Sequence, residues 1–370
     1  MNVLCIVGIS FGSTRTLLNR IGPCCVVKSQ FFSHTMKPQS DKLVTVEDNI
    51  FCPSSELDLG ITLKGGQSFR WSAHGESYRG VYDNCVWTVS QTDTELFYKV
   101  QGSHKVASKN YTQLLRDYFR LDLSLEENCK KWAASDKHFG KSLSKTDGVR
   151  ILNQDVVENL FSFICSSNNN IQRISSMVEK MCTLFGDSIG IIDGKEYYGF
   201  PSIESLAKDN VEAVLKKEKF GYRAGYIANT AKHLLKVGGR EWLMGLRKEN
   251  NTVYSTAREQ LMTLPGVGPK VADCVCLMSL GHLEAIPIDT HIFQVVKANY
   301  LPHLNKLKTV TPKMHDEIGG HLRELWGPMA GWAQAVVFCA KINNTDRLYW
   351  YPNLPSENIL LSYFVQTEIS

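Results

Sequence analysis

Short stretches rich in β-branched and aromatic residues follow one another along the first half of the chain. They are separated by residues typical of turns and lie at Ser68–Trp71, Tyr78–Tyr82, Val86–Ser90 and Glu95–Val100. Such spacing predicts an antiparallel meander of short strands. A stripe of apolar residues at helical spacing follows at Leu114, Leu115, Tyr118 and Phe119. We expect this helix to pack on one face of the sheet.

From about Asp155 onward the apolar positions recur with the period of an α-helix. The segment Asp155–Cys165 carries an apolar stripe and ends in the polar run Ser166–Asn170, which is typical of a helix stop followed by a cap. The same period predicts helices at Ile171–Phe185, Tyr222–Val237, Thr256–Leu264, Lys270–Leu280, Thr290–Asn299, Pro312–Leu325 and Ala330–Ala340. Short loops join them, so we expect one all-α domain without internal repeats.

Together the two patterns predict an α+β fold with two folded domains. An antiparallel β/α domain with packed helices occupies 46–150, and an all-α domain occupies 151–345. Residues 1–45 form a basic leader, because the first forty residues hold Lys and Arg but no Asp or Glu. That composition resembles a mitochondrial transit peptide, with a disordered leader as the alternative. Residues 346–370 form an aromatic tail, either packed or unstructured.

Composition narrows the broad class of protein. Hydrophobic residues make up 43% of the chain and charged residues 21%, which is ordinary for a globular protein. No apolar run approaches the ~20 residues that span a bilayer, so we expect no membrane partner. The net charge of +4 is compatible with nucleic acid, although local basic residues matter more. The 11 cysteines form no C-x-x-C pair, which indicates reduced thiols rather than a zinc site.

One segment has the pattern of a helix, a glycine hairpin and a second helix. Its sequence is Leu264-Pro-Gly-Val-Gly-Pro-Lys270. Gly266 and Gly268 allow positive φ and close backbone approach, and Pro269 fits the start of the second helix. Backbone N–H groups beside a helix N-terminus can bind phosphate, and the carbonyls of Leu264 and Val267 could instead hold a bridging cation. We expect contact with a DNA backbone; a purely structural αα-hairpin is the alternative.

A lysine and an aspartate follow this hairpin, and the residues between them are enough for one helix and a return loop. Lys270 stands at a helix N-terminus, where partial positive charge disfavours a protonated amine. A neutral amine can attack an electrophilic carbon, whereas the alternative is a solvated lysine on phosphate. Asp289 comes 289 − 270 = 19 residues later, at a predicted helix N-cap. Its carboxylate could stabilise positive charge on a sugar carbon and assist proton movement. His291 is expected to contact phosphate or to support the site.

Taken together, these residues resemble the eukaryotic 8-oxoguanine DNA glycosylase/AP lyase family of the helix-hairpin-helix superfamily. The resemblance covers about residues 50 to 343. It rests on several motifs in one order, namely Gly66–Trp71, Ser162–Ile171, Gly221–Ala224, Val267–Cys274, Leu325–Pro328 and Gly331–Ala335. Neither the first forty residues nor the segment from Asn343 to the C-terminus matches the family pattern.

The resemblance implies that a damaged base is flipped out of the duplex before it is excised. It implies that Phe338 stacks on one face of the flipped purine and that Cys274 forms the opposite wall of the base pocket. It also implies that Gln334 reads the Watson–Crick edge of that base. Met278 extends the Cys274 face, with core packing as the alternative. The Gly66 carbonyl would accept the N7 proton that 8-oxoguanine carries and guanine lacks, which gives strong discrimination.

The resemblance also implies contacts with the DNA that remains stacked. Asn168, Arg173 and Arg223 match the family's readers of the orphaned cytosine, since Arg donates in bidentate geometry and Asn can fill the vacated space. Tyr222 resembles the wedge that enters the base stack. From the residues alone, the alternatives are a helix cap for Asn168 and surface charge for the two arginines.

The resulting hypothesis is a bifunctional base excision repair enzyme that removes 8-oxoguanine and related oxidised purines opposite cytosine. A lysine Schiff base would lead to strand cleavage 3′ to the site by β-elimination. A glycosylase of the same fold for another base, a non-enzymatic DNA-binding module and a structural helical protein are the alternatives. We expect a monomer that binds duplex DNA and needs no cofactor beyond a structural cation at the hairpin. We expect it in the nucleus, and also in mitochondria if the leader is a transit peptide.

Overall fold

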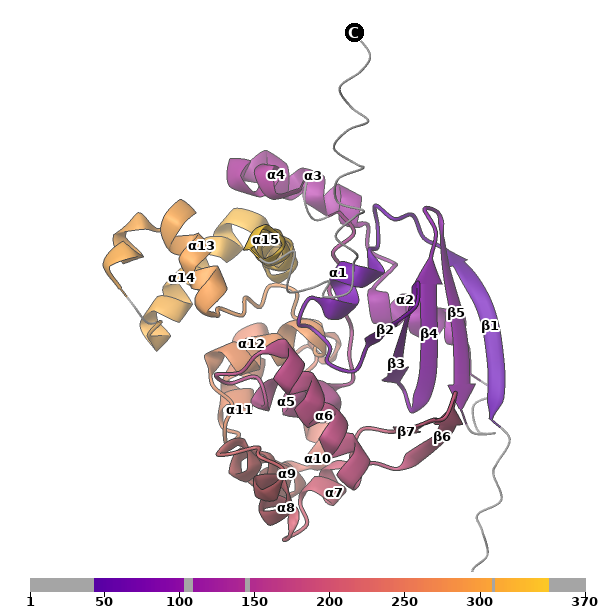
Figure 1. Cartoon of the computed structure of the whole chain (residues 1–370). Helices are drawn as coiled ribbons and strands as arrows, with labels where there is room; N and C mark the ends of the chain where they lie inside the picture. Colours follow the sequence, from indigo (N-terminus) through magenta and orange to yellow (C-terminus); the bar gives the residue numbers. More distant parts are fainter. Residues whose placement is uncertain (1–42, 103–108, 144–146, 308–309, 346–370) are drawn as a thin grey trace, which may run out of the picture. The chain divides into compact units, whose positions relative to one another are not determined.

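A five-stranded antiparallel sheet dominates the N-terminal part of the computed structural model (Figure 1). The structure describes residues 43–102, 109–143, 147–307 and 310–345, with side chains up to residue 340. The strands lie in the order β1-β5-β4-β3-β2. Their bounds are β1 (Val44–Phe51), β2 (Ser72–His74), β3 (Ser77–Tyr82), β4 (Cys85–Gln91) and β5 (Glu95–Gly102).

The predicted meander is confirmed in β2 to β5, with two differences. The stretch Ser68–Trp71 is irregular, and β2 begins only at Ser72. The residue before this stretch, Gln67, bonds to the distant segment that holds Arg150 and Gln154. Strand β1 pairs with β5 along its whole length but was not predicted. As an edge strand it buries only Ile50, and Asp48 interrupts the alternation of Val44, Val46 and Ile50, so its apolar signal is weak.

Helix α2 (Tyr111–Phe119) packs on the sheet as predicted. Leu115, Tyr118 and Phe119 are buried with Trp87 and the other apolar residues of one sheet face. The Tyr118 hydroxyl accepts a hydrogen bond of 2.9 Å from the Trp71 indole, so the end of the irregular stretch is attached to the same helix. A short helix, α1 (Leu59–Lys64), joins β1 to this stretch. Within the described ranges no helix is long and apolar enough to cross a membrane.

Helices form most of the rest of the chain. They are α3 (Leu125–Ser135), α4 (Lys137–Leu143), α5 (Val156–Ile164), α6 (Ile171–Phe185), α7 (Ile203–Leu206), α8 (Val211–Lys217), α9 (Arg223–Val237), α10 (Gly239–Gly245), α11 (Tyr254–Met262), α12 (Pro269–Met278), α13 (Thr290–Asn299), α14 (Pro312–Trp326) and α15 (Ala330–Thr345). Short 3₁₀ segments lie at Lys248–Asn250, Pro302–Lys306 and Gly327–Met329. The predicted helices are present, and α15 is longer than expected.

The helical part also holds a β-hairpin, so the expectation of an all-α domain is wrong at this point. Strands β6 (Ser188–Ile192) and β7 (Lys195–Tyr198) are antiparallel. Asp193 and Gly194 join them with φ values of +50° and +78°, which is the geometry that Asp-Gly favours in a tight hairpin turn. The hairpin packs through Ile192 and Tyr197 on Val81 and Val86 of the larger sheet.

The core does not separate at the predicted boundary between residues 150 and 151. Phe69, Trp132 and Phe139 belong to the same buried cluster as the helices that follow residue 150. The predicted domain limits themselves stay a prediction. The predicted leader and tail lie outside the described residues, because the structure does not describe residues 1–42 and 346–370.

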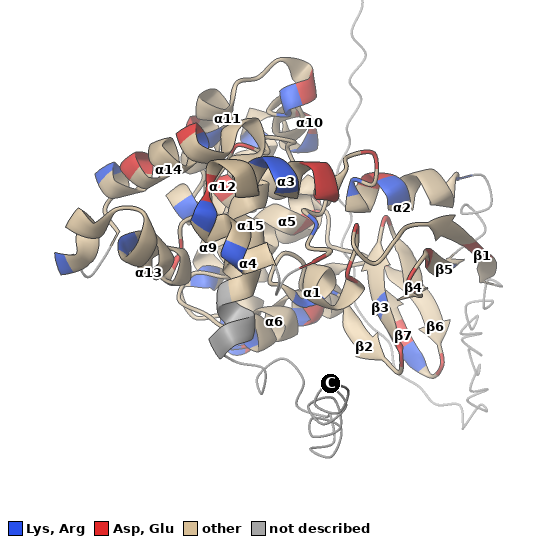
Figure 2. Ribbon diagram, turned by 90° about the horizontal axis from the view of Figure 1, so that it is seen from above, with Lys and Arg blue, Asp and Glu red and all other residues tan. Residues whose placement is uncertain are grey.

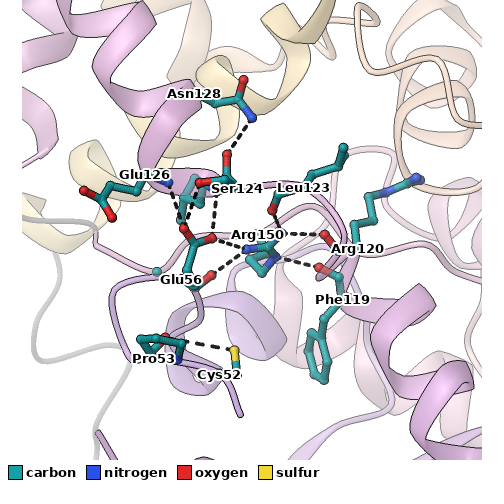
Figure 3. Close-up of polar contacts among 12 residues, drawn as sticks. Cys52, Pro53, Glu56, Phe119, Arg120, Leu123, Ser124, Glu126, Asn128 and Arg150 are labelled. Carbon is teal, nitrogen blue, oxygen red and sulfur yellow. Dashed lines mark hydrogen bonds and ion pairs between the residues drawn. The ribbon is translucent and has the colours of Figure 1, made fainter. Parts of the chain in front are cut away.

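A buried arginine fastens three segments of the N-terminal part (Figure 3). Arg150 is 0% exposed and donates hydrogen bonds to the carbonyls of Phe119, Arg120 and Leu123 and to both the carbonyl and the carboxylate of Glu56. The same carboxylate accepts the backbone N–H groups that open α3. Although burial opposes the shift, these bonds hold the pKa of Glu56 below its usual value. A satisfied network of this kind is costly to break.

Candidate active site

The glycine hairpin connects α11 to α12 as predicted, and α9 holds it in place. Gly266 has φ +78°, and a Cβ there would lie 2.5 Å from the Tyr226 ring. The Thr230 hydroxyl donates a 2.6 Å hydrogen bond to the Pro265 carbonyl. Only a glycine therefore fits at position 266.

The second glycine of the hairpin differs from the first. Gly268 has φ −95° and open space around it, so it does not use the positive φ that we expected. It serves as the N-cap residue of α12, and Pro269 occupies the first turn as predicted. Its openness leaves room for a close ligand at the helix N-terminus.

Lys270 reaches from the first turn of α12 toward the end of α5. Its Nζ lies 3.2 Å from Ser166 Oγ and 4.7 Å from the centre of the Phe163 ring. The side chain is partly buried, and among the described residues it forms no ion pair. The amine is thus held against α5 rather than extended into solvent, and no carboxylate of the described residues forms an ion pair with it.

The Cys274 thiol lies beside this amine, and Asp289 lies close enough to the thiol to affect its pKa. The Cys274 thiol is 2% exposed, and its pKa is raised to about 11 mainly by burial, an effect that Lys270 opposes and Asp289 reinforces. It is therefore a neutral thiol near pH 7. Asp289 is the N-cap of α13 and accepts the Ile292 N–H at 2.8 Å, so the predicted capping is confirmed. The structure thus gathers a nitrogen, a sulfur and a carboxylate from two helix starts.

The turn at Gly66 is fastened to the far end of α12. Gly66 has φ +79°, and the next residue, Gln67, is 4% exposed. The Gln67 amide bonds to the Arg150 carbonyl at 2.7 Å and to the Leu152 N–H at 3.1 Å. Gln154 donates through its side chain to the Gln67 carbonyl at 2.8 Å, and its own N–H donates to the Met278 carbonyl at 2.7 Å. The Gly66 turn therefore has a fixed position relative to the helix that carries Lys270.

Two of the predicted pocket residues lie on α15. Gln334 is 6% exposed, and among the described residues its side chain has no hydrogen-bond partner. Phe338 is partly buried one turn later and meets the His291 ring edge to face at 6.2 Å. The start of α15 is tied to the loop before Asp289, since the Gly331 N–H donates to the Leu283 carbonyl at 2.9 Å. Close packing at Gly331 leaves no room for a side chain there.

A second group of predicted residues meets at the loop after α5 and the start of α9. The Arg223 guanidinium is buried, donates to the carbonyls of Ser167 and Asn168, and lies 4.6 Å from the Tyr222 ring centre. Tyr222 is 52% exposed and donates to the Ser167 carbonyl at 3.1 Å. Arg223 is thus not a free surface charge. A single guanidinium nitrogen, Nη2, makes both bonds and holds the loop that presents Asn168.

Asn168 and Arg173 lie close to the start of α6, and their alternatives were a helix cap and a surface charge. Asn168 has φ +48° and does not cap α6; that cap is Asn170, whose side chain accepts the Arg173 N–H at 2.9 Å. Arg173 itself is exposed on α6, where one guanidinium nitrogen lies 3.4 Å from the Lys219 carbonyl. The exposed side chains of Asn168, Arg173 and Tyr222 are therefore available to a ligand.

A buried polar cluster supports α12 on another side. Asp273 is 0% exposed and lies 2.6 Å from the Tyr254 hydroxyl, 3.1 Å from Arg258 Nε and 3.3 Å from His315 Nε2. Burial raises the pKa of Asp273 to about 7, against the effect of Tyr254 and Arg258. Burial, with Arg258 beside it, lowers the pKa of His315 to about 4. The cluster joins α11, α12 and α14, and so it fixes the hairpin from behind.

Charge alone does not mark the binding face. Within the described ranges, Lys and Arg (blue) and Asp and Glu (red) are interspersed over the helices rather than gathered on one element (Figure 2). Exposed pairs such as Lys130–Glu126 and Lys216–Glu212 account for some of them. Among the described residues no three His, Cys, Asp or Glu side chains are grouped to bind a metal ion. The cation predicted at the Leu264 and Val267 carbonyls stays a prediction.

Comparison with known protein families decides the assignment. Residues 49–160 match the N-terminal domain of 8-oxoguanine DNA glycosylase, and residues 161–318 match the HhH-GPD superfamily of base excision DNA repair proteins. The chain belongs to this glycosylase family. The N-glycosylase/DNA lyase OGG1 of Arabidopsis thaliana is 38% identical over 317 residues, which cover 84% of this chain and 81% of the relative. The Saccharomyces cerevisiae N-glycosylase/DNA lyase is 38% identical over 326 residues, 79% of this chain and 85% of that protein.

Solved structures of 8-oxoguanine glycosylases share the fold. MBOgg1 in complex with a low-affinity DNA ligand has a TM-score of 0.69 at 30% identity and covers 82% of this chain and 99% of its own. The Clostridium acetobutylicum 8-oxoguanine glycosylase/lyase, in complex with double-stranded DNA containing cytosine opposite 8-oxoG, has a TM-score of 0.68 at 26% identity. That match covers 82% of this chain and 98% of the other. These similarities confirm the α+β class of the glycosylase.

Sequence reasoning missed the residues of this glycosylase that support the site from outside. Gln67, Gln154, Tyr226 and Asp273 contact the site elements but lie in motifs that read as ordinary turn or helix. The separation of 87 residues between Gln67 and Gln154 leaves no local signal for their bond. Asp273 offered one hint, since a charged residue inside the apolar stripe of a predicted helix needs a buried partner.

Proposed function

We propose that this N-glycosylase/DNA lyase excises 8-oxoguanine opposite cytosine in duplex DNA and forms a Schiff base through Lys270. The observation that carries the proposal is the placement of the Lys270 amine. It is partly buried, forms no ion pair with a described carboxylate, and lies beside the Cys274 thiol, which Asp289 also affects. The N-glycosylase/DNA lyase relatives at 38% identity support the same reaction class.

The chemistry follows from an amine nucleophile and a nearby carboxylate. The Nζ–C1′ bond forms as the C1′–N9 bond breaks, and the base leaves with that electron pair and takes up a proton. Asp289 stabilises the positive charge that develops on the sugar. The nitrogen then loses a proton, and its lone pair forms the C=N bond of the iminium as the C1′–O4′ bond breaks. O4′ leaves with the electron pair of that bond and takes up a proton. The iminium acidifies a C2′ proton, and its removal expels the 3′ phosphate by β-elimination.

Base recognition is assigned to Gly66 and to the side chains of Gln334, Phe338, Cys274 and Met278. The Gly66 carbonyl accepts the N7 proton of 8-oxoguanine. Gln334 is buried without a described partner, so its amide is available to the Watson–Crick edge. A purine stacks between the Phe338 ring and the Cys274 wall. The hydrogen bonds that attach the Gly66 turn to α12 hold the Gly66 carbonyl in a fixed position relative to the helix that carries the Lys270 amine.

The remaining DNA contacts are assigned to two surfaces. Asn168, Arg173 and Arg223 read the orphaned cytosine, and the exposed Tyr222 ring wedges into the stack. The hairpin at Gly266 and Gly268, with His291 and the proposed cation on the Leu264 and Val267 carbonyls, holds the phosphate backbone. This assignment predicts that binding weakens as salt rises.

The test is excision from duplexes that carry 8-oxoguanine opposite each of the four bases, with and without borohydride. We expect preferred cleavage opposite cytosine and a covalent adduct with borohydride. Lys270→Gln should abolish the adduct. Lys313→Gln is the matched control, because Lys313 is exposed and likewise follows a proline at the start of a helix, α14. An undiminished adduct in Lys270→Gln would refute the assignment, and duplex binding without cleavage would favour a non-enzymatic module.

We also propose a monomer in the nucleus and in mitochondria. The basic leader supports mitochondrial import, and a fluorescent fusion with and without residues 1–40 tests it. Loss of mitochondrial signal on deletion is the expected result. Light scattering on the eluted protein checks the monomer against a mass of 41.7 kDa.

A further inference from the structure

The last turn of α5 presents acceptor groups to the Lys270 amine. Ser166 Oγ lies 3.2 Å from Nζ and 2.8 Å from the Phe163 carbonyl. A hydroxyl has one proton, and the carbonyl can only accept, so the Ser166 proton is committed to Phe163. Toward Lys270 the serine oxygen therefore acts as an acceptor of an amine N–H.

The Phe163 side chain contributes a second acceptor. Its ring centre lies 4.7 Å from Nζ, and the negative face of an aromatic ring attracts N–H groups. The ring is 2% exposed and meets Phe69 edge to face at 5.5 Å. Phe69 follows Gly66 by three residues, on the segment that Gln67 fastens to residues 150–154. The Phe163 ring that contacts the Lys270 amine thus packs on the segment that carries Gly66, the proposed base reader.

These contacts have a consequence for the nucleophile. A neutral lysine amine has two N–H groups and one lone pair. Two acceptors at Ser166 and Phe163 occupy the N–H groups. Of the neighbours named above, only the Cys274 thiol, a weak donor, can then bond to the lone pair. A donor at either position would instead compete for the electrons that the reaction needs.

We propose that Ser166 and Phe163 are positioning residues that orient the Lys270 lone pair toward the sugar carbon. This inference rests on the proposed Schiff-base function and adds two residues to it. Both act through Lys270 and neither touches the reacting carbon. Orientation of a nucleophile contributes to rate without any need to change DNA affinity.

The experiment compares Ser166→Ala, Ser166→Thr and Ser135→Ala in the full chain. Threonine keeps the hydroxyl. Ser135 is the matched control, because its hydroxyl makes the same bond to the carbonyl three residues earlier, 3.1 Å from Trp132 O, at the end of α3. Each variant is assayed for single-turnover excision and borohydride trapping on an 8-oxoguanine·cytosine duplex. Affinity for a duplex with an uncleavable abasic analogue and the melting temperature are measured alongside.

We expect Ser166→Ala to slow trapping by about 5- to 10-fold, as the loss of one hydrogen bond of ordinary strength implies. Affinity for the abasic analogue and the melting temperature should match those of Ser135→Ala, and Ser166→Thr should recover the rate to within about 2-fold. Phe163→Leu, which keeps apolar bulk without a ring face, should also slow trapping at unchanged affinity.

Three results would overturn the inference while the unsubstituted protein still traps. They are a wild-type rate in Ser166→Ala, a Ser166→Thr variant as slow as Ser166→Ala, or a loss of rate matched by a loss of affinity. Absence of trapping by the unsubstituted protein would instead refute the proposed function and this inference with it. The two failures are therefore distinguishable.

Discussion

The buried pair Asp273 and His315 predicts opposite pH dependences of stability in two single variants. In the folded chain the pKa of Asp273 is raised to about 7 and that of His315 is lowered to about 4, in both cases mainly by burial. In the unfolded chain the two groups return to about 3.9 and about 6.5. Between about pH 4 and 6.5 either state then binds one proton on the pair, on Asp273 when folded and on His315 when unfolded. The pair therefore adds almost no pH dependence to the parent protein.

When one partner is removed, the proton uptake of the other is no longer compensated, and stability becomes dependent on pH. In His315→Gln, the folded chain binds a proton on Asp273 that the unfolded chain does not hold, so stability falls as pH rises from about 4 to about 7. In Asp273→Asn, the unfolded chain binds a proton on His315 that the folded chain lacks, so stability falls as pH drops from about 6.5 toward 4. One proton corresponds to about 1.4 kcal/mol per pH unit in each case, with opposite sign.

Urea unfolding at several pH values between about 4.5 and 6 measures these slopes. The quantity to compare is the free energy of unfolding of each variant minus that of the parent at the same pH. As pH rises, we expect this difference in the free energy of unfolding to fall for His315→Gln and to rise for Asp273→Asn. Slopes of the same sign, or differences that do not change with pH in either variant, would contradict a proton held by Asp273 in the folded chain and by His315 in the unfolded chain.

Three further variants test other parts of the structure. Gly66→Ala adds a Cβ 3.2 Å from Ile171 Cδ1 at φ +79°, so excision of 8-oxoguanine should fall at least 10-fold while cleavage of a preformed abasic site changes less; equal losses in both assays would count against Gly66 as a base reader. Arg150→Met removes the buried guanidinium from the half-buried Glu56 carboxylate and from the carbonyls of Phe119, Arg120 and Leu123, and it should lower the free energy of unfolding by about 3–5 kcal/mol in urea. A change below about 1 kcal/mol would contradict the fastening role. Arg173→His should relax the preference for cytosine opposite the lesion, and unchanged selectivity over the four bases would remove that assignment.

The elements that the sequence predicted well are those with strong local signals. Helix α13 begins and ends where the pattern indicated, because Asp289 is a clear N-cap and the apolar stripe is regular. The hairpin before Lys270 follows from its glycines and Pro269. The elements that were missed have weak local signals. The exposed edge strand β1 buries one residue, and the β6–β7 turn at Asp193-Gly194 was overlooked inside a helical stretch.

The candidate site divides in the same way. The proximity of Cys274 to Lys270 could be predicted from spacing, because the two residues lie one helical turn apart in α12. Asp289 was likewise predicted correctly as a helix N-cap, and its action on the same sugar as Lys270 stays a prediction. Ser166 could not be connected to Lys270, since 104 residues separate them and each has an ordinary local role. The same limit applies to Gln67, whose bonds reach 83 to 87 residues along the chain. Long-range polar contacts depend on the packing of whole elements, which periodicity does not encode.

Mass spectrometry of the trapped adduct identifies the side chain that attacks the sugar. The full chain is incubated with an 8-oxoguanine·cytosine duplex and borohydride, digested, and the peptide that carries the deoxyribose remnant is sequenced. We expect the remnant to be attached to Nζ of Lys270 alone. Attachment at another amine, or strand cleavage without any covalent intermediate, would contradict it.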